Sequence, residues 1–243
     1  MCGKVGAGVQ YPAPLMLNEH ALPWFVKGFH LGHELHKNFS IDYDAKFKRG
    51  AFIARSTDIR EMFSFANPGQ VLDAVSVYAS HFYGSMLWDL YSEGAGQVYR
   101  SWNTCVKLAW DTPRMTHNLF VEMLSGDLPS VRKQILCQYM SFFRKLRQSP
   151  LREVRILANL VGRDTNSVTG RNLSNLMEEF PTLDPWTHGA AHFKTQYRGY
   201  LVPDEDQWRL PLLKKLLYQR REMDTCGEDV TTITELIDSL CTS

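Results

Sequence analysis

The sequence lacks the features that mark a membrane protein, a secreted protein or a disulfide-stabilised fold. No apolar run approaches the length of about 18 residues that a membrane helix needs. The N-terminal stretch MCGKVGAGVQYPAPLML contains two prolines and no continuous apolar core, so it does not fit a signal peptide. The five cysteines are odd in number and never occur as CxxC, which argues against a disulfide framework or a zinc knuckle. We therefore expect an intracellular protein, nuclear or cytoplasmic, with no membrane partner.

The sequence also lacks the short motifs that carry common catalytic chemistry. No GxGxxG, GxxxxGKS/T, GxSxG or HExxH pattern occurs. Carboxylate pairs such as Asp42 with Asp44, and Asp204 with Asp206, fit helix caps or solvated turns. The residues alone therefore indicate no catalytic site and no cofactor.

The segment FHLGHELHKN, residues 29–38, has the spacing of a metal site, because His30, His33 and His36 lie three residues apart. On a helix these positions fan out around the axis, and on a strand His33 points away from the other two. Neither geometry brings three imidazoles together, and no nearby Cys or Asp motif completes four ligands. We therefore interpret them as strand or surface residues, and a metal-dependent hydrolase is the least favoured hypothesis.

The net charge of +1 conceals an uneven distribution along the chain. Residues 129–163 contain eight Lys or Arg and one acidic residue, Glu153, whereas residues 200–243 contain five basic and nine acidic residues. A basic middle region is suited to contact a polyanion such as nucleic acid. Solvated helix faces explain the same pattern, and charge alone favours that explanation.

Strand signals are confined to the first third of the chain. Apolar runs over residues 15–17 and 22–35 are separated by the turn-prone tripeptide NEH, and Pro23 moves the start of the second strand to Trp24. We therefore predict an N-terminal β-hairpin whose second strand alternates faces from Trp24 to His33.

The remainder of the chain has helical periodicity, with apolar residues every three or four positions and capping residues before several runs. The predicted helices run after Asp42 or Asp44 through Phe47, Phe52, Ile59 and Phe63, from the cap Asn67 through Val71 to Leu90, after Thr112-Pro113, from Val131 to Leu146, after Ser149-Pro150, and from a Thr232–Glu235 capping box to Leu240. Residues 181–203 are predicted to be a loop or linker, and Pro211 is expected to kink or delay the next helix. The fold class is therefore mainly α.

Large aromatic residues gather between residues 83 and 110. They are Tyr83, Trp88, Tyr91, Tyr99, Trp102 and Trp110. Such rings are able to stack on nucleic-acid bases. We favour a core between two helices for most of them, because aromatic side chains at helical spacing are usually buried.

Several blocks of the chain, in the right order, resemble the end of the polymerase region of non-LTR (LINE-type) retrotransposon reverse transcriptases. The blocks are LMLNEHALPWFVKGFHLGHELHKNFSIDYDAKFKRGAFIARSTDIREMFSFANPGQVL, FYGSMLWDLY, YRSWNTCVKLAWDTPRMTHNLF, LSGDLPSVRKQIL, VTGRNLSNL and ITELIDSLCTS. Because separate blocks agree and together cover nearly the whole chain, the resemblance is more specific than any one of them. It implies a right-hand polymerase architecture in which a helical thumb holds an RNA template paired with a DNA primer.

The resemblance divides the chain into five regions. Residues 1–40 correspond to a primer-grip-like hairpin at the end of the palm, 41–95 to thumb-like helices, 96–180 to the helical region after the thumb, 181–203 to a linker and 204–243 to C-terminal helices. The fold class expected on this basis is mainly α, with an N-terminal β-hairpin, a multi-helix thumb-like bundle and a C-terminal helical region.

The resemblance also implies the residues that contact nucleic acid. Phe29, Leu31 and Gly32 fall on the aromatic–x–Leu–Gly element of the primer grip, where a glycine lets a partner backbone approach closely. In the thumb region Lys46, Lys48 and Arg49 are expected to contact phosphates, which positions nucleic acid without reading its sequence. The expected nucleic-acid-binding site therefore consists of Phe29, Leu31, Gly32, Lys46, Lys48 and Arg49.

The chain departs from the family in what it lacks. The paired palm aspartates that hold Mg²⁺ would lie upstream of this hairpin, as would the fingers and the endonuclease, and a C-terminal cysteine–histidine knuckle is missing. Two-metal nucleotide transfer needs those aspartates, so we expect a truncated copy that does not polymerise by itself. The palm and fingers of the parent protein are a further expected partner, and the alternative hypothesis is a non-enzymatic helical protein-interaction module or an element remnant.

Overall fold

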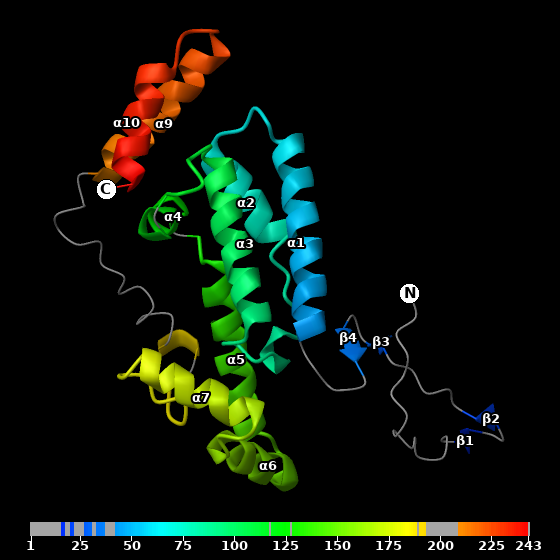
Figure 1. Ribbon diagram of the computed structural model, residues 1–243. Coiled ribbons are helices and arrows are strands. Elements are labelled where there is room, and N and C mark those ends of the chain that lie inside the picture. The colour runs from blue at the N-terminus through cyan, green and yellow to red at the C-terminus, as the bar shows by residue number, and fades with distance from the viewer. Residues whose placement is uncertain are drawn as a thin grey trace, which may run out of the picture.

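The computed structural model describes residues 16–17, 20–21, 27–30, 33–36, 42–116, 118–126, 128–188, 190–192 and 209–242. This part of the chain is mainly helical, which confirms the predicted class (Figure 1). Its helices are α1 (Asp42–Met62), α2 (Pro68–Tyr78), the 3-10 turn η1 (Ser85–Leu87), α3 (Glu93–Ala109), α4 (Asn118–Leu124), α5 (Val131–Arg147), α6 (Arg152–Arg163), α7 (Val168–Glu179), α9 (Arg209–Thr225) and α10 (Thr231–Thr242).

The strands that the structure describes form two separate antiparallel pairs. The pairs are β1 (Met16–Leu17) with β2 (His20–Ala21), and β3 (Lys27–His30) with β4 (His33–His36). The single hairpin predicted for residues 1–40 is therefore not supported, and His30 and His33 are paired across two strands instead of alternating along one. An apolar run does not by itself determine whether it forms one long strand or two shorter strands that pair with each other.

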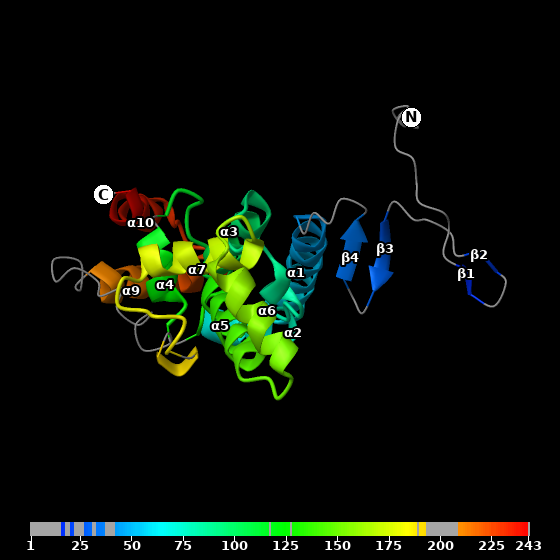
Figure 2. The same cartoon turned by 90° about the horizontal axis from the view of Figure 1, so that it is seen from below.

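Helices α1, α2 and α3 lie side by side, and α6 and α7 lie at the opposite end of the helical body from α9 and α10 (Figure 1). β4 contacts α1, as the view from below shows (Figure 2). Fully buried side chains from several helices form one core. Its largest members are Trp88, Trp102, Phe52, Phe82, Phe143, Leu72, Leu90, Ile135, Leu136, Met140 and Leu173.

Only some of the apolar residues predicted to line one face of α1 are buried in the core. Phe52 and Ile59 are buried, whereas Phe47 is 45% and Phe63 is 40% exposed. Phe52 and Ile59 are seven residues apart and share one face, but Phe47 is rotated by about 140° from Phe52 at about 100° per residue. Phe63 follows the end of the helix. Phe52 and Ile59 lie on the face of α1 that packs against α2 and α3.

The continuous helix predicted for residues 71–90 is wrong, because α2 ends at Tyr78. Ser80 N–H donates a hydrogen bond to the Val75 carbonyl at 3.2 Å, which closes the last turn. Gly84 then has a φ of +83°, in the left-handed region that a regular helix excludes. The apolar periodicity continues across this break because Phe82 packs into the same core.

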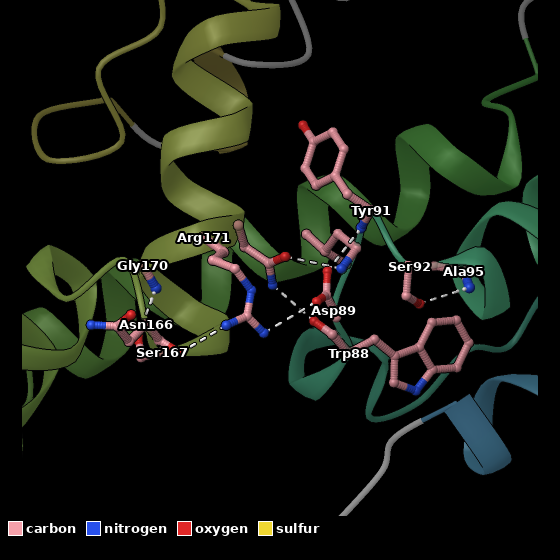
Figure 3. Close-up of polar contacts among 11 residues, drawn as sticks. Trp88, Asp89, Tyr91, Ser92, Ala95, Asn166, Ser167, Gly170 and Arg171 are labelled. Atoms are coloured by element: carbon pink, nitrogen blue, oxygen red, sulfur yellow. Dashed lines mark hydrogen bonds and ion pairs between the residues drawn. The ribbon is translucent and has the colours of Figure 1, made fainter.

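Side-chain capping marks the starts of four described helices, α2, α3, α5 and α7. At Asn67 the predicted capping box is confirmed: its side chain accepts from the Gln70 N–H at 2.9 Å, and its own N–H donates to the Gln70 side chain at 3.3 Å. Ser92, Ser130 and Ser167 cap α3, α5 and α7 in the same way with their hydroxyl oxygens. The first and last of these caps are visible in Figure 3.

Two predicted helix starts are displaced. After Thr112-Pro113 the chain makes a turn, in which Thr116 N–H donates to the Pro113 carbonyl, and α4 begins later. Before α10, the Asp229 carboxylate accepts from the Thr231 N–H at 2.9 Å, and the helix begins at Thr231, one residue before the expected cap Thr232. Local turns of the Asx and ST type compete with the helix cap at both positions. The helix predicted from Val131 is confirmed as α5.

A buried side chain from α7 holds the loop before α3. The Asn172 amide donates to the Trp88 carbonyl at 2.8 Å and accepts from the Leu90 N–H at 2.9 Å, so it replaces a missing backbone partner for both groups. Beside it Arg171 forms an ion pair with Asp89 at 3.3 Å (Figure 3). These contacts fix α7 against the start of α3.

The predicted aromatic core is confirmed for the tryptophans. Trp88, Trp102 and Trp110 are buried, and the indole N–H of Trp110 donates to the Leu124 carbonyl at 3.0 Å. Tyr83, in contrast, is 65% exposed. The cluster is therefore mainly part of the interior of the helical body.

The C-terminal pair α9 and α10 packs on the ends of α3 and α4. Leu213, Leu217 and Ile237 are buried in the shared core, and the Arg220 guanidinium pairs with Asp111 at 2.5 Å. Pro211 is the third of the residues that the structure describes in α9. Residues 205–208 lie outside the described ranges, so the kink or delayed start expected at Pro211 stays a prediction.

Candidate nucleic-acid interface

The three cations predicted in the thumb region do not form one cluster. Lys46 is exposed on α1, with its ammonium 5.8 Å from the ring centroid of Tyr43. Lys48 is half-buried. Arg49 points toward α3, where its Nε donates to the Ser101 hydroxyl at 3.1 Å. At about 100° per residue, Lys48 lies about 160° around the helix from Lys46, whereas Lys46 and Arg49 lie only about 60° apart.

The predicted primer-grip residues are only partly described by the structure. Phe29 lies on β3, where its backbone is paired in register with Glu34 of β4. Leu31 and Gly32 lie outside the described residues. The position of the β3–β4 pair is fixed by β4, which contacts α1 at the end that carries Lys46.

A cavity of about 170 Å³ lies between α1 and α3. Three arginines line it, Arg49 and Arg60 from α1 and Arg100 from α3. Its other lining residues are Phe52, Ile53, Ser56, Thr57, Val71, Gln97, Ser101, Thr104, Cys105, Leu108 and Ala109. We call this cavity with its lining the arginine groove. None of the described residues that line it is acidic.

Arg60 and Arg100 are functional candidates that the sequence reasoning missed. Helical spacing in the sequence could have indicated them. Arg49, Ser56 and Arg60 recur at intervals of seven and four residues on α1, which places them on one face. On α3, Arg100 and Thr104 repeat at the same four-residue interval. Each row lies on one face of its helix, but only the pairing of α1 with α3 brings the rows together.

The three guanidinium groups differ in their present partners. Arg100 pairs with the exposed Glu93, and hydrogen bonds from Gln97 and Arg100 lower the pKa of that carboxyl. Arg49 contacts the neutral Ser101 hydroxyl, and for Arg60 the described residues provide no hydrogen bond or ion pair. The groove therefore retains positive charge that an anionic ligand is suited to neutralise.

Two uncharged polar groups lie in the wall of the groove. The Ser56 residue is 8% exposed, and no nitrogen or oxygen of the described residues pairs with its hydroxyl. The Cys105 thiol lies near it; burial raises the pKa of this thiol to about 11, and the Ser56 hydroxyl and the Arg60 charge oppose that shift. The thiol is therefore protonated at neutral pH and does not act as an anion.

A second cavity, of about 660 Å³, continues from the arginine groove toward α9 and α10. Both cavities share Arg60, Val71, Leu108 and Ala109 in their linings. In the larger cavity acidic residues accompany the basic ones, and Arg221 donates to the Ser64 carbonyl at 2.8 Å. Its charges are therefore largely balanced, and it is a weaker candidate for an anion.

His33 is a docking residue for the β3–β4 pair. Its Nδ1 lies 3.2 Å from Oδ2 of the buried Asp44, which also accepts from the Trp88 indole N–H at 2.8 Å. The ring lies against Tyr83, with centroids 5.5 Å apart, and over Gly84, where a Cβ would fall 1.5 Å from its Cε1. These contacts hold β4 on α1. Within the described ranges no group of His, Cys, Asp or Glu is arranged to hold a metal ion.

Comparisons with known proteins give no assignment for this chain. No protein-family model matches it, and neither the curated proteins nor the solved structures contain a match. Of the helices that the structure describes, none combines the length and apolarity needed to span a lipid bilayer.

Proposed function

We propose that the chain is a thumb-like helical module that binds an RNA template paired with a DNA primer, as the C-terminal part of a non-LTR reverse transcriptase. The observation that supports this most directly is the arginine groove, where Arg49, Arg60 and Arg100 surround a cavity without an acidic residue in its described lining. Guanidinium groups bind phosphate through paired hydrogen bonds, so the groove suits a sugar–phosphate backbone.

The spacing of the cations along α1 fits a polymeric anion better than a single phosphate. Arg49 and Arg60 are eleven residues apart, which corresponds to about 16 Å along a helix axis. Phosphates along one strand repeat at about 3.4 Å, so these two arginines would contact different phosphates. Lys46, on the exposed face of the same helix, extends the positive surface toward β4.

In this proposal the N-terminal segment has the role of a primer grip. Phe29, Leu31 and Gly32 would contact the primer backbone, and the contact of His33 with Asp44 would hold them beside the positive end of α1. Phosphoryl transfer itself belongs to the palm of the parent RNA-directed DNA polymerase, whose aspartates hold Mg²⁺. The chain itself is proposed to bind without a cofactor.

The test is the affinity of the full chain for an RNA–DNA hybrid across a range of salt concentrations. Each phosphate contact that is removed should lower the slope of log affinity against log salt by about 0.9. We expect Arg49→Gln plus Arg60→Gln to reduce the slope by about 2 and to weaken binding at low salt. Lys46→Glu plus Arg49→Glu should weaken binding further through repulsion.

Arg55→Gln is the matched control for these variants, because Arg55 is exposed on α1 and lines neither cavity. This variant should change the slope much less than the groove variants do. Absence of hybrid binding by the wild-type chain at low salt would refute the proposal. Equal effects of Arg55→Gln and Arg60→Gln would refute the assignment to the groove.

A protein-interaction module is the second candidate, and α6 is the observation that favours it. Its apolar side chains face solvent: Leu151, just before the helix, Ile156, Leu157 and Leu160 are 47–63% exposed. Exposed apolar patches of this kind commonly mark contact sites for other proteins. Self-association of the chain, together with no affinity for the hybrid, would favour this candidate over nucleic-acid binding.

A further inference from the structure

The arginine groove has an apolar interior as well as a charged rim. Phe52, Ile53, Val71, Leu108 and Ala109 form its apolar wall. Its volume of about 170 Å³ is below the range of about 300–1,000 Å³ that is typical of sites for drug-sized ligands. The interior is therefore suited to one small group and is too small for a base pair or a whole dinucleotide cofactor.

The interior also contains a buried polar group whose bonding capacity is not fully used. The Ser56 hydroxyl lies beside the Cys105 thiol, with which it makes a weak hydrogen bond, and no nitrogen or oxygen of the described residues pairs with it. Because a thiol is a weak hydrogen-bonding partner, the hydroxyl is able to bond a polar ligand atom in the cavity. Thr57 and Thr104 add hydroxyl groups to the lining, and Gln97 adds an amide.

The rim of the groove supplies positive charge for the anionic part of the ligand. Arg49, Arg60 and Arg100 line the same cavity from both helices. A ligand that fits all three features has a flat, partly apolar body, hydrogen-bonding atoms along one edge, and a phosphate attached nearby. A nucleotide has this combination, because its base carries polar atoms on its edge and its phosphate lies one sugar away.

We propose that the cavity between α1 and α3 takes the base of one unpaired nucleotide, with the phosphates on either side of that nucleotide on different arginines of the rim. This inference rests on the proposed binding of a template–primer hybrid and names the part of that ligand which enters the groove: the single-stranded template next to the duplex. A base within the duplex is excluded because its partner would have to enter with it. The bound base would give the Ser56 hydroxyl a stronger hydrogen-bond partner than the thiol and cover the apolar wall.

The experiment compares three forms of one RNA–DNA hybrid: blunt, with a short single-stranded template overhang, and with the same overhang made of abasic nucleotides. The two overhangs carry equal charge, so their difference measures the base alone. We expect the full chain to bind the base-bearing overhang at least about fivefold more tightly than the abasic one, which is the lower end of base-stacking effects. Equal affinity for both overhangs would overturn the inference.

Thr104→Phe is the blocking variant, because Thr104 is exposed at the rim and a larger side chain there narrows the cavity without disturbing the core. Ala54→Phe is its control, since Ala54 is exposed on α1 and does not line the cavity. Thr104→Phe should remove the preference for the base-bearing overhang, and Ala54→Phe should retain it. Ser56→Ala should reduce the preference for the base-bearing overhang. A preference that survives Thr104→Phe would overturn the assignment to this cavity.

The outcomes separate this inference from the function on which it rests. Binding of the blunt hybrid without a preference for bases leaves the thumb-like function intact and rejects the base site. If no hybrid binds, adenosine monophosphate and ribose 5-phosphate are titrated directly and followed by NMR at α1 and α3. Selective shifts with adenosine monophosphate would then support the base site alone, and identical or absent shifts would reject it.

Discussion

A methyl group at position 84 is expected to displace His33 and with it the β3–β4 pair. In Gly84→Ala the new Cβ would lie 1.5 Å from Cε1 and 2.1 Å from Nε2 of His33, so the ring has to leave its place. The φ of +83° adds a backbone cost of about 1–2 kcal/mol for a residue that has a side chain.

The loss of the His33 contacts makes a second contribution to the destabilisation by Gly84→Ala. A hydrogen bond to a charged group such as the Asp44 carboxylate contributes about 1.5–3 kcal/mol, and a ring contact such as that with Tyr83 contributes about 0.5–1.5 kcal/mol. We therefore expect Gly84→Ala to lower the free energy of unfolding by about 3–6 kcal/mol. In a His33→Ala background, where no ring is displaced, the same change should cost only the backbone part of about 1–2 kcal/mol.

The measurement is urea unfolding of the four variants of this double-mutant cycle, followed by circular dichroism. Gly50→Ala is the control, because Gly50 lies within α1 and a Cβ added there would have no neighbouring atom within 4 Å. Alanine at that position should stabilise the helix by about 0.5–1 kcal/mol. An equal cost of Gly84→Ala in both backgrounds would show that His33 is not seated on this glycine.

Two further predictions concern buried groups in the helical body. The unfolded Cys105 thiol has a pKa of 9.0 and the folded one a pKa of about 11, so the free energy of unfolding should fall as the pH rises from about 9 to about 11. Cys105→Ala should remove this fall, and a thiol reagent at neutral pH should modify the exposed Cys226 before Cys105. Asn172→Ala should lower the free energy of unfolding, measured with heat or urea, by about 2–5 kcal/mol, because the Trp88 carbonyl and the Leu90 N–H lose their partner. Asn166→Ala, on an exposed turn, should change stability by less than about 0.5 kcal/mol, and a similar effect of both variants would contradict the role of Asn172.

Local chemistry explains the parts of the fold that could be predicted from the sequence. The capping box of Asn67 and Gln70 and the periodicity of α5 depend on residues within a few positions of one another, so a short window of sequence contains all the information. The mainly α fold class was predicted correctly for the same reason, because helical periodicity is also a local property of the sequence. The helix expected from residue 71 to residue 90 failed because apolar periodicity persists through a break that Gly84 produces by its backbone conformation.

The candidate site depends on contacts that a local pattern does not contain. The resemblance singled out Lys46, Lys48 and Arg49 in the thumb region, but Lys48 lies on a different face of α1 from Lys46. Arg60 and Arg100 join Arg49 only after α1 pairs with α3. Similarly, the register that opposes His30 to His33 depends on which strands pair, and a single apolar run does not determine that choice.

The contact of Asn172 with the loop before α3 has a consequence for how the chain is made. Its amide is 84 residues from the Trp88 carbonyl and 82 residues from the Leu90 N–H along the sequence. During synthesis α1, α2 and α3 therefore leave the ribosome well before the side chain that completes their junction, and these two backbone groups must remain hydrated until α7 emerges. A fragment that stops at α5 would keep the helices of the arginine groove but leave that junction open to water and to proteases.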